Sequence, residues 1–300
     1  MWRPDWPCEP FDILRSTRRG AGDPAFQRDP GGALWRAAHT PEGPSTVRIQ
    51  RLPGLRAVEV KGWGSGADWM LEQAPDMLGA ADTTAQEFTP ADPRISTLWR
   101  RHPHWRVPRT GLVMEALLGA VIEQKVTGHE AWLGWRRLLC RFGSPAPGPG
   151  AERGMRCPPS SETLTGIPSW EWLRCHIDPA RSQTIVRAAR RAAGLERTLD
   201  LAPADVEAKL TSVPGIGVWT AAEIRQRAHG DCDAVSFGDY HVASHIGWAL
   251  TGHEISDSQL EELLAPHQPH RYRVQHLVTS HLSGRPRRGP RMAPRRHLPR

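Results

Sequence analysis

The sequence lacks several features that would place the chain in a well-known class at once. No apolar run approaches the length of about 18 residues that a transmembrane helix requires. The five cysteines, at positions 8, 140, 157, 175 and 232, form no C-x-x-C pair, so the usual spacing of zinc and iron–sulfur sites is missing. Lysine occurs only at positions 61, 125 and 209, which restricts any mechanism that needs a Schiff-base amine. These absences favour a cytoplasmic protein with free thiols and no metal.

Positive charge is present in excess, and it is concentrated at one end of the chain. The 300 residues include 39 basic and 32 acidic side chains, which gives a net charge of +7. Residues 285–300 hold seven arginines and no acid, so the rest of the chain is close to neutral. Such a tail is either a phosphate-binding segment or a disordered, solubilising end, and the sequence leaves both readings open.

Periodicity divides the chain before this tail into two regions. Residues 46–61 contain two runs of alternating apolar and polar residues on either side of a Pro-Gly pair, which predicts a β-hairpin. A further strand is expected at 34–38 and a helix at 67–78. Helical spacing of apolar residues then continues from residue 95 onward, with a break near Thr127. We predict an α+β fold: a mixed N-terminal domain at 1–92, an all-helical region at 93–283 and the basic tail at 284–300.

The most specific pattern lies between Leu210 and Tyr240. It places the turn Pro214-Gly215-Ile216-Gly217 between two predicted helices, and Asp239 follows 22 residues after Gly217. Glycines allow another backbone to approach closely, and the helix after the turn presents unpaired N–H groups, so the turn suits a phosphate. Without Asp239, the same turn is more often an ordinary tight connection between antiparallel helices.

With Asp239 included, this segment resembles the helix-hairpin-helix DNA glycosylase superfamily. In that family the pattern L-x-x-x-P-G-I-G-x-W-T-A precedes a catalytic Asp and a Tyr, here Asp239 and Tyr240. Residues 116–127, ALLGAVIEQKVT, are similar to the family's first core helix, which ends at a pocket glutamine, here Gln124. The nearest members are bacterial DNA-3-methyladenine glycosylases of type II, whose N-terminal α+β domain resembles half of a TATA-binding protein. The likeness covers roughly residues 10–280.

The resemblance implies a monofunctional glycosylase of base excision repair. Such an enzyme binds double-stranded DNA as a monomer, flips out an alkylated purine of the 3-methyladenine or 7-methylguanine type, and hydrolyses its N-glycosidic bond. It implies Asp239 as the catalytic carboxylate, although an aspartate here would also serve as a helix N-cap. The implied substrate-pocket residues are Gln124, Trp219 and Tyr240. The implied DNA-binding residues are Lys125, Thr127, Val213, Gly215, Gly217 and Thr220. The resemblance implies no organic cofactor, and a monovalent cation at the hairpin is left open.

Three positions bear on the reaction. Trp219 stands where strand-cleaving members carry a nucleophilic lysine, which implies hydrolysis by water; Trp219 is read either as a wall for a cationic purine or as a plain core residue. Lys125 occupies a wedge position that is usually apolar, and Glu223 replaces an expected aromatic residue, so both put the substrate range in doubt.

The alternative function is a non-catalytic helix-hairpin-helix DNA-binding protein. A bifunctional 8-oxoguanine-type or iron–sulfur enzyme is disfavoured by Trp219 and by the dispersed cysteines.

Overall fold

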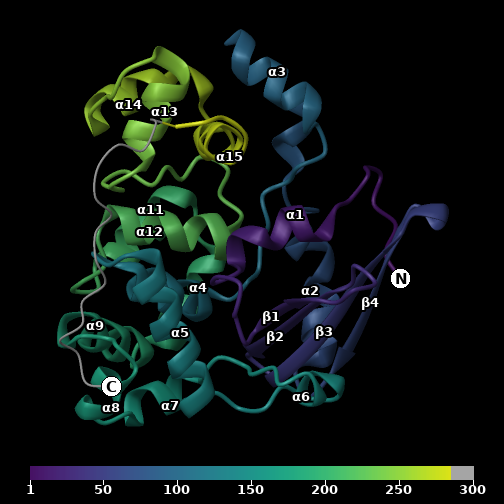
Figure 1. Ribbon diagram of the computed structural model, residues 1–300, viewed down its shortest axis with the longest axis vertical. Helices are drawn as coiled ribbons and strands as arrows, with labels where there is room; N and C mark the ends of the chain where they lie inside the picture. The colour runs from purple at the N-terminus through teal and green to yellow at the C-terminus, as the bar shows by residue number, and fades with distance from the viewer. Residues whose placement is uncertain (285–300) are drawn as a thin grey trace.

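The computed structural model describes residues 1–284, in which a four-stranded antiparallel sheet is followed by a large helical region (Figure 1). The predicted α+β fold class is confirmed. The arginine-rich tail at 285–300, with its two readings, lies outside the described residues. Within residues 1–284, no helix has the length and apolar character needed to cross a membrane.

The N-terminal sheet is built in simple sequence order. Its strands are β1 (Phe26–Arg28), β2 (Leu34–Thr40), β3 (Gly43–Leu52) and β4 (Ala57–Trp63). The predicted hairpin at 46–61 is β3 and β4, with Ile49 opposite Val60, and the predicted strand at 34–38 is β2. Side chains alternate between the two faces of β2, and both faces are covered. Leu34 packs toward α1 (Pro10–Leu14) and α2 (Ala67–Met77), whereas Trp35 contacts the segment 146–157 on the other face.

The helical region follows the sheet, at the left and top of Figure 1. Its helices are α3 (Pro93–Arg101), α4 (Val113–Glu123), α5 (Gly128–Phe142), α6 (Pro149–Glu152), α7 (Ser161–Gly166), α8 (Ser169–Arg174), α9 (Pro179–Ala189), α10 (Ala192–Glu196), α11 (Pro203–Thr211), α12 (Val218–Ile224), α13 (Val242–Thr251), α14 (Asp257–Leu264) and α15 (Arg271–His281).

These helices enclose two separate apolar cores. The larger core surrounds α4, whose Leu117 and Val121 are fully buried among residues of α5, α9, α11 and α12. The second core joins α3 to α13, α14 and α15, so that Ile95 packs with Ile246 and Val274 from the far end of the chain. The connection that carries Asp239 runs from the first core to the second. It begins after α12, which continues into a π-helical turn at Arg225–His229.

The break predicted near Thr127 separates α4 from α5. Thr127 is the N-cap of α5: its hydroxyl accepts a hydrogen bond from the Glu130 amide, and the Glu130 carboxylate accepts one from the Thr127 amide. This capping box satisfies amides at the start of α5 that have no partner within the helix. The loop from Gln124 to Thr127 is thereby fixed beside α12, which packs against α4.

Candidate functional site

The hairpin between α11 and α12 consists of residues 213–217, here called the hairpin turn. Val213 and Ile216 are buried and anchor the turn in the larger apolar core, while Pro214, Gly215 and Gly217 face solvent. Thr220, in the first turn of α12, is buried as well. The alternation of apolar and small residues therefore directs backbone, rather than side chains, toward the outside.

The two glycines of the hairpin turn serve different purposes. Gly215 has a φ of +99°, and a Cβ atom there would lie 2.0 Å from the Thr184 hydroxyl oxygen on α9, so the fold itself requires glycine. Gly217 has a φ of −99°, which any residue can adopt, and a Cβ atom would meet nothing within 4 Å. The packing of this chain gives no reason for glycine at 217. The open space there lies at the N-cap of α12, which no side chain caps.

Gln124 connects the end of α4 to the hairpin turn. Its side-chain amide donates to the Gly215 carbonyl at 3.0 Å and to the Thr220 hydroxyl at 2.8 Å. The structure thus brings together three of the predicted site residues. Since this amide is engaged with the hairpin turn, the predicted contact of Gln124 with a substrate base stays a prediction.

Lys125 follows directly and lies at the exposed tip between α4 and α5. Its backbone is in the left-handed region, with a φ of +54°, which is uncommon for a residue other than glycine. Lys125 is thus an exposed residue that directly follows Gln124, the residue bonded to the hairpin turn. The neighbouring Thr127 uses its hydroxyl in the capping box, and its predicted role in DNA binding stays a prediction.

Asp239 lies against Trp219 at the start of α13. One carboxylate oxygen, Oδ2, accepts a hydrogen bond from the Trp219 indole N–H at 3.0 Å. The other, Oδ1, accepts from the backbone amides of His241 at 2.7 Å and Val242 at 3.1 Å. The carboxylate thus bonds to the amide of His241, the N-cap residue of α13, and to the first amide of the helix, and at the same time it contacts the residue at the motif's tryptophan position. Both readings of Asp239 drawn from the sequence are compatible with this geometry.

Two other aspartates precede Asp239 in the same connection, and their surroundings differ from its own. Asp231 forms an ion pair with Arg225 at 2.7 Å, and Asp233 forms one with Arg271 at 2.6 Å. Among residues 1–284, no basic side chain forms an ion pair with Asp239. Its negative charge is held by dipoles alone, which leaves it free to interact with a positive charge from outside.

Tyr240 extends from this site into solvent. It is 90% exposed and makes an edge-on contact with His241, at a centroid distance of 4.8 Å. Trp219, in contrast, is only partly exposed, because its ring packs at the start of α12 beside Asp239. The structure therefore pairs Trp219 with the carboxylate and leaves Tyr240 outside this pair.

Glu223 lies one helical turn beyond Trp219 and points into the protein. It is buried and forms an ion pair with Arg227 at 2.6 Å. Burial acts to lower the pKa of Arg227, but the Glu223 carboxylate and other groups outweigh it, and the pKa lies above its ordinary value. Arg227 also donates to the Ser16 carbonyl at 2.9 Å, which links the helical region to the N-terminal domain.

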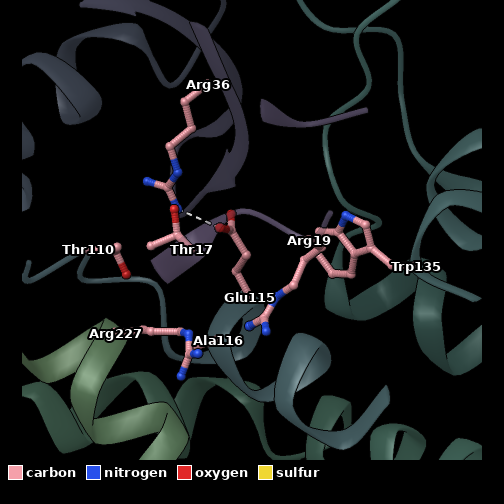
Figure 2. A pocket seen from close by; sticks show the side chains of 8 residues that line it. All are labelled: Thr17, Arg19, Arg36, Thr110, Glu115, Ala116, Trp135 and Arg227. Atoms are coloured by element: carbon pink, nitrogen blue, oxygen red, sulfur yellow. Dashed lines mark hydrogen bonds and ion pairs between the residues drawn. The ribbon is translucent and has the colours of Figure 1, made fainter. Parts of the chain in front are cut away.

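Arg227 also reaches a small cavity between the N-terminal domain and α4 (Figure 2). Arg36 points across this cavity to Glu115 and pairs with it, and Arg19 pairs with Glu123 at 2.7 Å. The cavity measures about 10 Å³, which is room for about one water molecule. It is a charged contact between domains, and it is far too small for a nucleobase.

Comparison with known proteins adds to this geometry. No family model matches the chain. A Mycobacterium tuberculosis protein named "Probable bifunctional transcriptional activator/DNA repair enzyme AlkA" is 30% identical over 218 residues, or 68% of this chain. The chain spans only 40% of the length of that relative. Among solved structures, the 3-methyladenine DNA-glycosylase of Archaeoglobus fulgidus matches with a TM-score of 0.76 and 20% identity, over 93% of this chain and 97% of that one. The chain has the fold of the helix-hairpin-helix DNA glycosylases.

Two further glycosylase structures support the same fold. The 8-oxoguanine glycosylase/lyase of Clostridium acetobutylicum, in complex with DNA, matches with a TM-score of 0.69 and 13% identity, over 90% of each chain. A 3-methyladenine DNA glycosylase of Schizosaccharomyces pombe matches with a TM-score of 0.54 and 17% identity, over 66% of this chain and 96% of that one. The glycosylase fold thus extends over at least 90% of the chain, and the resemblance read from residues 116–127 and 210–240 is confirmed at the level of fold.

Proposed function

We propose that this chain is a monofunctional DNA glycosylase that hydrolyses the N-glycosidic bond of alkylated purines flipped out of double-stranded DNA. The observation that carries the proposal is the Asp239 carboxylate, which is held by the Trp219 indole and by the backbone amides of His241 and Val242. Unlike Asp231 and Asp233, it is not neutralised by an arginine of the described residues. A fixed, unpaired carboxylate beside an exposed turn is suited to stabilising a cation.

The reaction requires such a group. Cleavage of the bond between sugar and base develops positive charge on the sugar, and an oriented carboxylate near C1′ lowers the energy of that state. An attacking water adds its oxygen to C1′ and loses its proton, which the same carboxylate can accept. A purine alkylated at N3 or N7 already carries a positive charge and leaves as a neutral base. No strong general acid is therefore needed.

Trp219 supports the monofunctional form of this reaction. The group that contacts Asp239 is an indole N–H, which cannot act as an amine nucleophile, so water is the nucleophile. The aromatic face of Trp219 also suits a cationic base, because the ring quadrupole attracts positive charge.

The relatives support the choice of substrate and partner. The Mycobacterium tuberculosis protein is named as a DNA repair enzyme, and the Archaeoglobus and Schizosaccharomyces structures are named as 3-methyladenine glycosylases. The Clostridium structure was solved with DNA bound. We extend these properties to this chain as part of the proposal, and we propose that it acts as a monomer at the nucleoid.

Base release from defined DNA tests the proposal. The purified chain is incubated with a duplex methylated at purines and, separately, with a duplex that contains 8-oxoguanine opposite cytosine. Released bases are identified by mass, and strand integrity is followed on a denaturing gel. We expect release of N3- and N7-methylpurines, with strands that break only after alkaline treatment.

Three other outcomes would contradict this expectation in different ways. Tight duplex binding without any released base would indicate a DNA-binding protein without chemistry. Release of 8-oxoguanine alone would leave the enzyme class but change its substrate. Strand cleavage without added base would contradict the monofunctional reading and would direct attention to Lys125, the exposed amine beside the hairpin turn.

A further inference from the structure

A short turn with a buried first residue leads into Asp239. Residues 236–239, here called the Asp239 turn, are closed by a hydrogen bond from the Asp239 amide to the Ser236 carbonyl, at 3.2 Å. Gly238 has a φ of +82°, which this close turn requires. Its amide donates to the Asp257 carboxylate at the start of α14, at 3.0 Å. One end of the turn presents Asp239 to solvent, and the other end is Ser236, which is 1% exposed.

Ser236 uses every hydrogen-bonding group that its side chain has. Its hydroxyl donates to the Glu223 carboxylate at 2.6 Å and accepts from the side-chain amides of Gln226 at 2.8 Å and Gln275 at 3.0 Å. A serine hydroxyl offers one donor and two acceptor sites, so it is saturated. The Ser236 backbone amide donates to the Gln275 side-chain oxygen at 3.0 Å. We call Ser236, Glu223, Gln226 and Gln275 the Ser236 cluster.

The partners of Ser236 come from elements that lie on both sides of the connection. Glu223 is on α12, one turn beyond the Trp219 that contacts Asp239, and Gln226 is in the π-helical turn that follows. Gln275 is on α15, in the second apolar core. All three are buried. The cluster therefore fixes the start of the Asp239 turn relative to both cores and, through α12, relative to Trp219.

A carboxylate acts on a developing charge only from the correct position. Displacement of a catalytic group by about 1 Å can lower a rate by roughly 100-fold, because electrostatic stabilisation depends on prearranged geometry. The three hydrogen bonds of the Asp239 carboxylate define its orientation: two come from the backbone that directly follows Asp239, and the third comes from Trp219 on α12. The Ser236 cluster supplies the connection from the Asp239 turn to the rigid interior.

We propose that Ser236 is a positioning residue, which the Ser236 cluster holds in place so that the Asp239 carboxylate keeps its orientation against Trp219 and α13. The proposal rests on the proposed function in one respect, namely that Asp239 acts on the sugar. Neither Ser236 nor Glu223 contacts the substrate in this proposal. Glu223, which replaces an expected aromatic residue, here supplies the acceptor that saturates Ser236.

The test compares two buried serines. Ser236→Ala removes the cluster's hydroxyl, and Ser236→Cys keeps similar volume with a weaker donor. Ser45→Ala is the matched control, because Ser45 is 0% exposed in the N-terminal sheet and its hydroxyl has no hydrogen-bond partner among the described residues. Single-turnover release of a methylated purine, duplex affinity and amide hydrogen exchange are measured for each, in the parent and in the Asp239→Asn background.

We expect Ser236→Ala to slow base release by roughly 10- to 100-fold, with Ser236→Cys between it and the parent. Duplex affinity should stay within about twofold of the parent, because the hairpin turn is unchanged. The amides of His241 and Val242, which Asp239 accepts from, should exchange faster. In the Asp239→Asn background, Ser236→Ala should cause no further slowing. Ser45→Ala should leave all of these measurements unchanged.

Several results would overturn the proposal. The first is a Ser236→Ala variant that releases the base as fast as the parent. The second is a Ser236→Ala change that slows release as much in the Asp239→Asn background as in the parent. The third is hydrogen exchange at His241 and Val242 that Ser236→Ala leaves unchanged. A loss of rate that accompanies an equal loss of affinity and a uniform rise in exchange would show general destabilisation instead. If Ser236→Ala does not fold, Ser236→Cys decides the question by the same measurements. Absence of base release in the parent would contradict the proposed function alone, because hydrogen exchange still reports whether Ser236 positions Asp239.

Discussion

The hairpin turn and the Asp239 turn flank the same helical segment and are built in opposite ways. The hairpin turn is anchored from inside by apolar side chains, Val213 and Ile216, and presents bare backbone at Gly217. The Asp239 turn is anchored by the saturated polar Ser236 cluster and presents a charged side chain. Backbone amides bind the phosphates of DNA whatever its base sequence, whereas a carboxylate repels phosphates. Under the proposed function, we therefore assign DNA affinity to the hairpin turn and chemistry to the Asp239 turn.

The largest expected effect is on chemistry, through Asp239→Asn. This change keeps the size of the side chain and an oxygen for the amides of His241 and Val242, but it removes the negative charge that stabilises the sugar cation in the proposed mechanism. We expect single-turnover release of an N3- or N7-methylated purine to fall by about 10²- to 10³-fold. Duplex affinity should be retained or improved, because a carboxylate that repels phosphates is gone.

The matched control for Asp239→Asn is Asp233→Asn, at an aspartate that Arg271 neutralises. We expect that change to alter the stability of the fold rather than the reaction rate at saturating protein. Full activity of Asp239→Asn would remove Asp239 from the mechanism. Joint loss of folding and binding would make it a structural cap of α13 alone.

The second prediction separates the two glycines of the hairpin turn by their effect on the fold. Gly215→Ala forces an alanine into a φ of +99° and places its Cβ against Thr184. We expect a loss of about 1–3 kcal/mol in the free energy of unfolding, measured by urea denaturation. A free energy equal to that of the parent would show that the turn relaxes without cost and that the close contact with α9 is not essential.

The third prediction concerns the other glycine and is smaller. Gly217→Val introduces a side chain into open space, so the free energy of unfolding should stay close to that of the parent. We expect duplex affinity to fall by roughly 10- to 100-fold for any sequence, since a hydrogen bond to a charged group contributes about 1.5–3 kcal/mol. The base-release rate at saturating protein should be retained. Fluorescence anisotropy with a labelled duplex measures the affinity.

Gly166→Val provides the control for Gly217→Val. Gly166 ends α7, and a Cβ atom there also meets nothing within 4 Å, so the two changes are sterically alike. This variant should bind DNA as the parent does. Unchanged affinity in Gly217→Val would exclude the hairpin turn as the docking element, and a slower release rate with unchanged affinity would reverse the roles assigned to the two turns.

The sequence predicts those features whose structure depends on residues that are close together in the chain. The hairpin at 46–61 and the break at Thr127 depend on neighbouring residues, and both were predicted correctly. Asp239 and Trp219 are 20 residues apart and form a hydrogen bond. The motif read from the sequence contains both residues, so it is compatible with this contact. The Ser236 cluster carries no such signal, because Gln275 is 39 residues away and isolated serines and glutamines have many structural uses. The contact of α3 with α15 is equally non-local.

The smallest expected effect depends on pH and again distinguishes the two turns. His276 lies on α15 next to Gln275, and its ring stacks on Trp105 at a centroid distance of 3.8 Å. Burial, with smaller contributions from Arg15 and His281, lowers the pKa of His276 to about 3. The neutral ring is therefore favoured in the folded chain, while the unfolded chain takes up a proton near the ordinary pKa of about 6.5. Stability from this residue is complete above pH 6.5 and declines as the pH falls toward 3.

A His276→Phe variant keeps an aromatic ring on Trp105 but cannot titrate. Between pH 7 and pH 6, we expect the parent to lose at most about 1 kcal/mol more of its free energy of unfolding than the variant loses. Hydrogen exchange should show the acid-induced loosening on α15 and at the Asp239 turn, which Gln275 anchors, and not at the hairpin turn. Equal pH dependence in both proteins would exclude His276 as the cause. Loosening that begins at the hairpin turn would mean that the two turns share one anchor, which contradicts the separation of binding from chemistry.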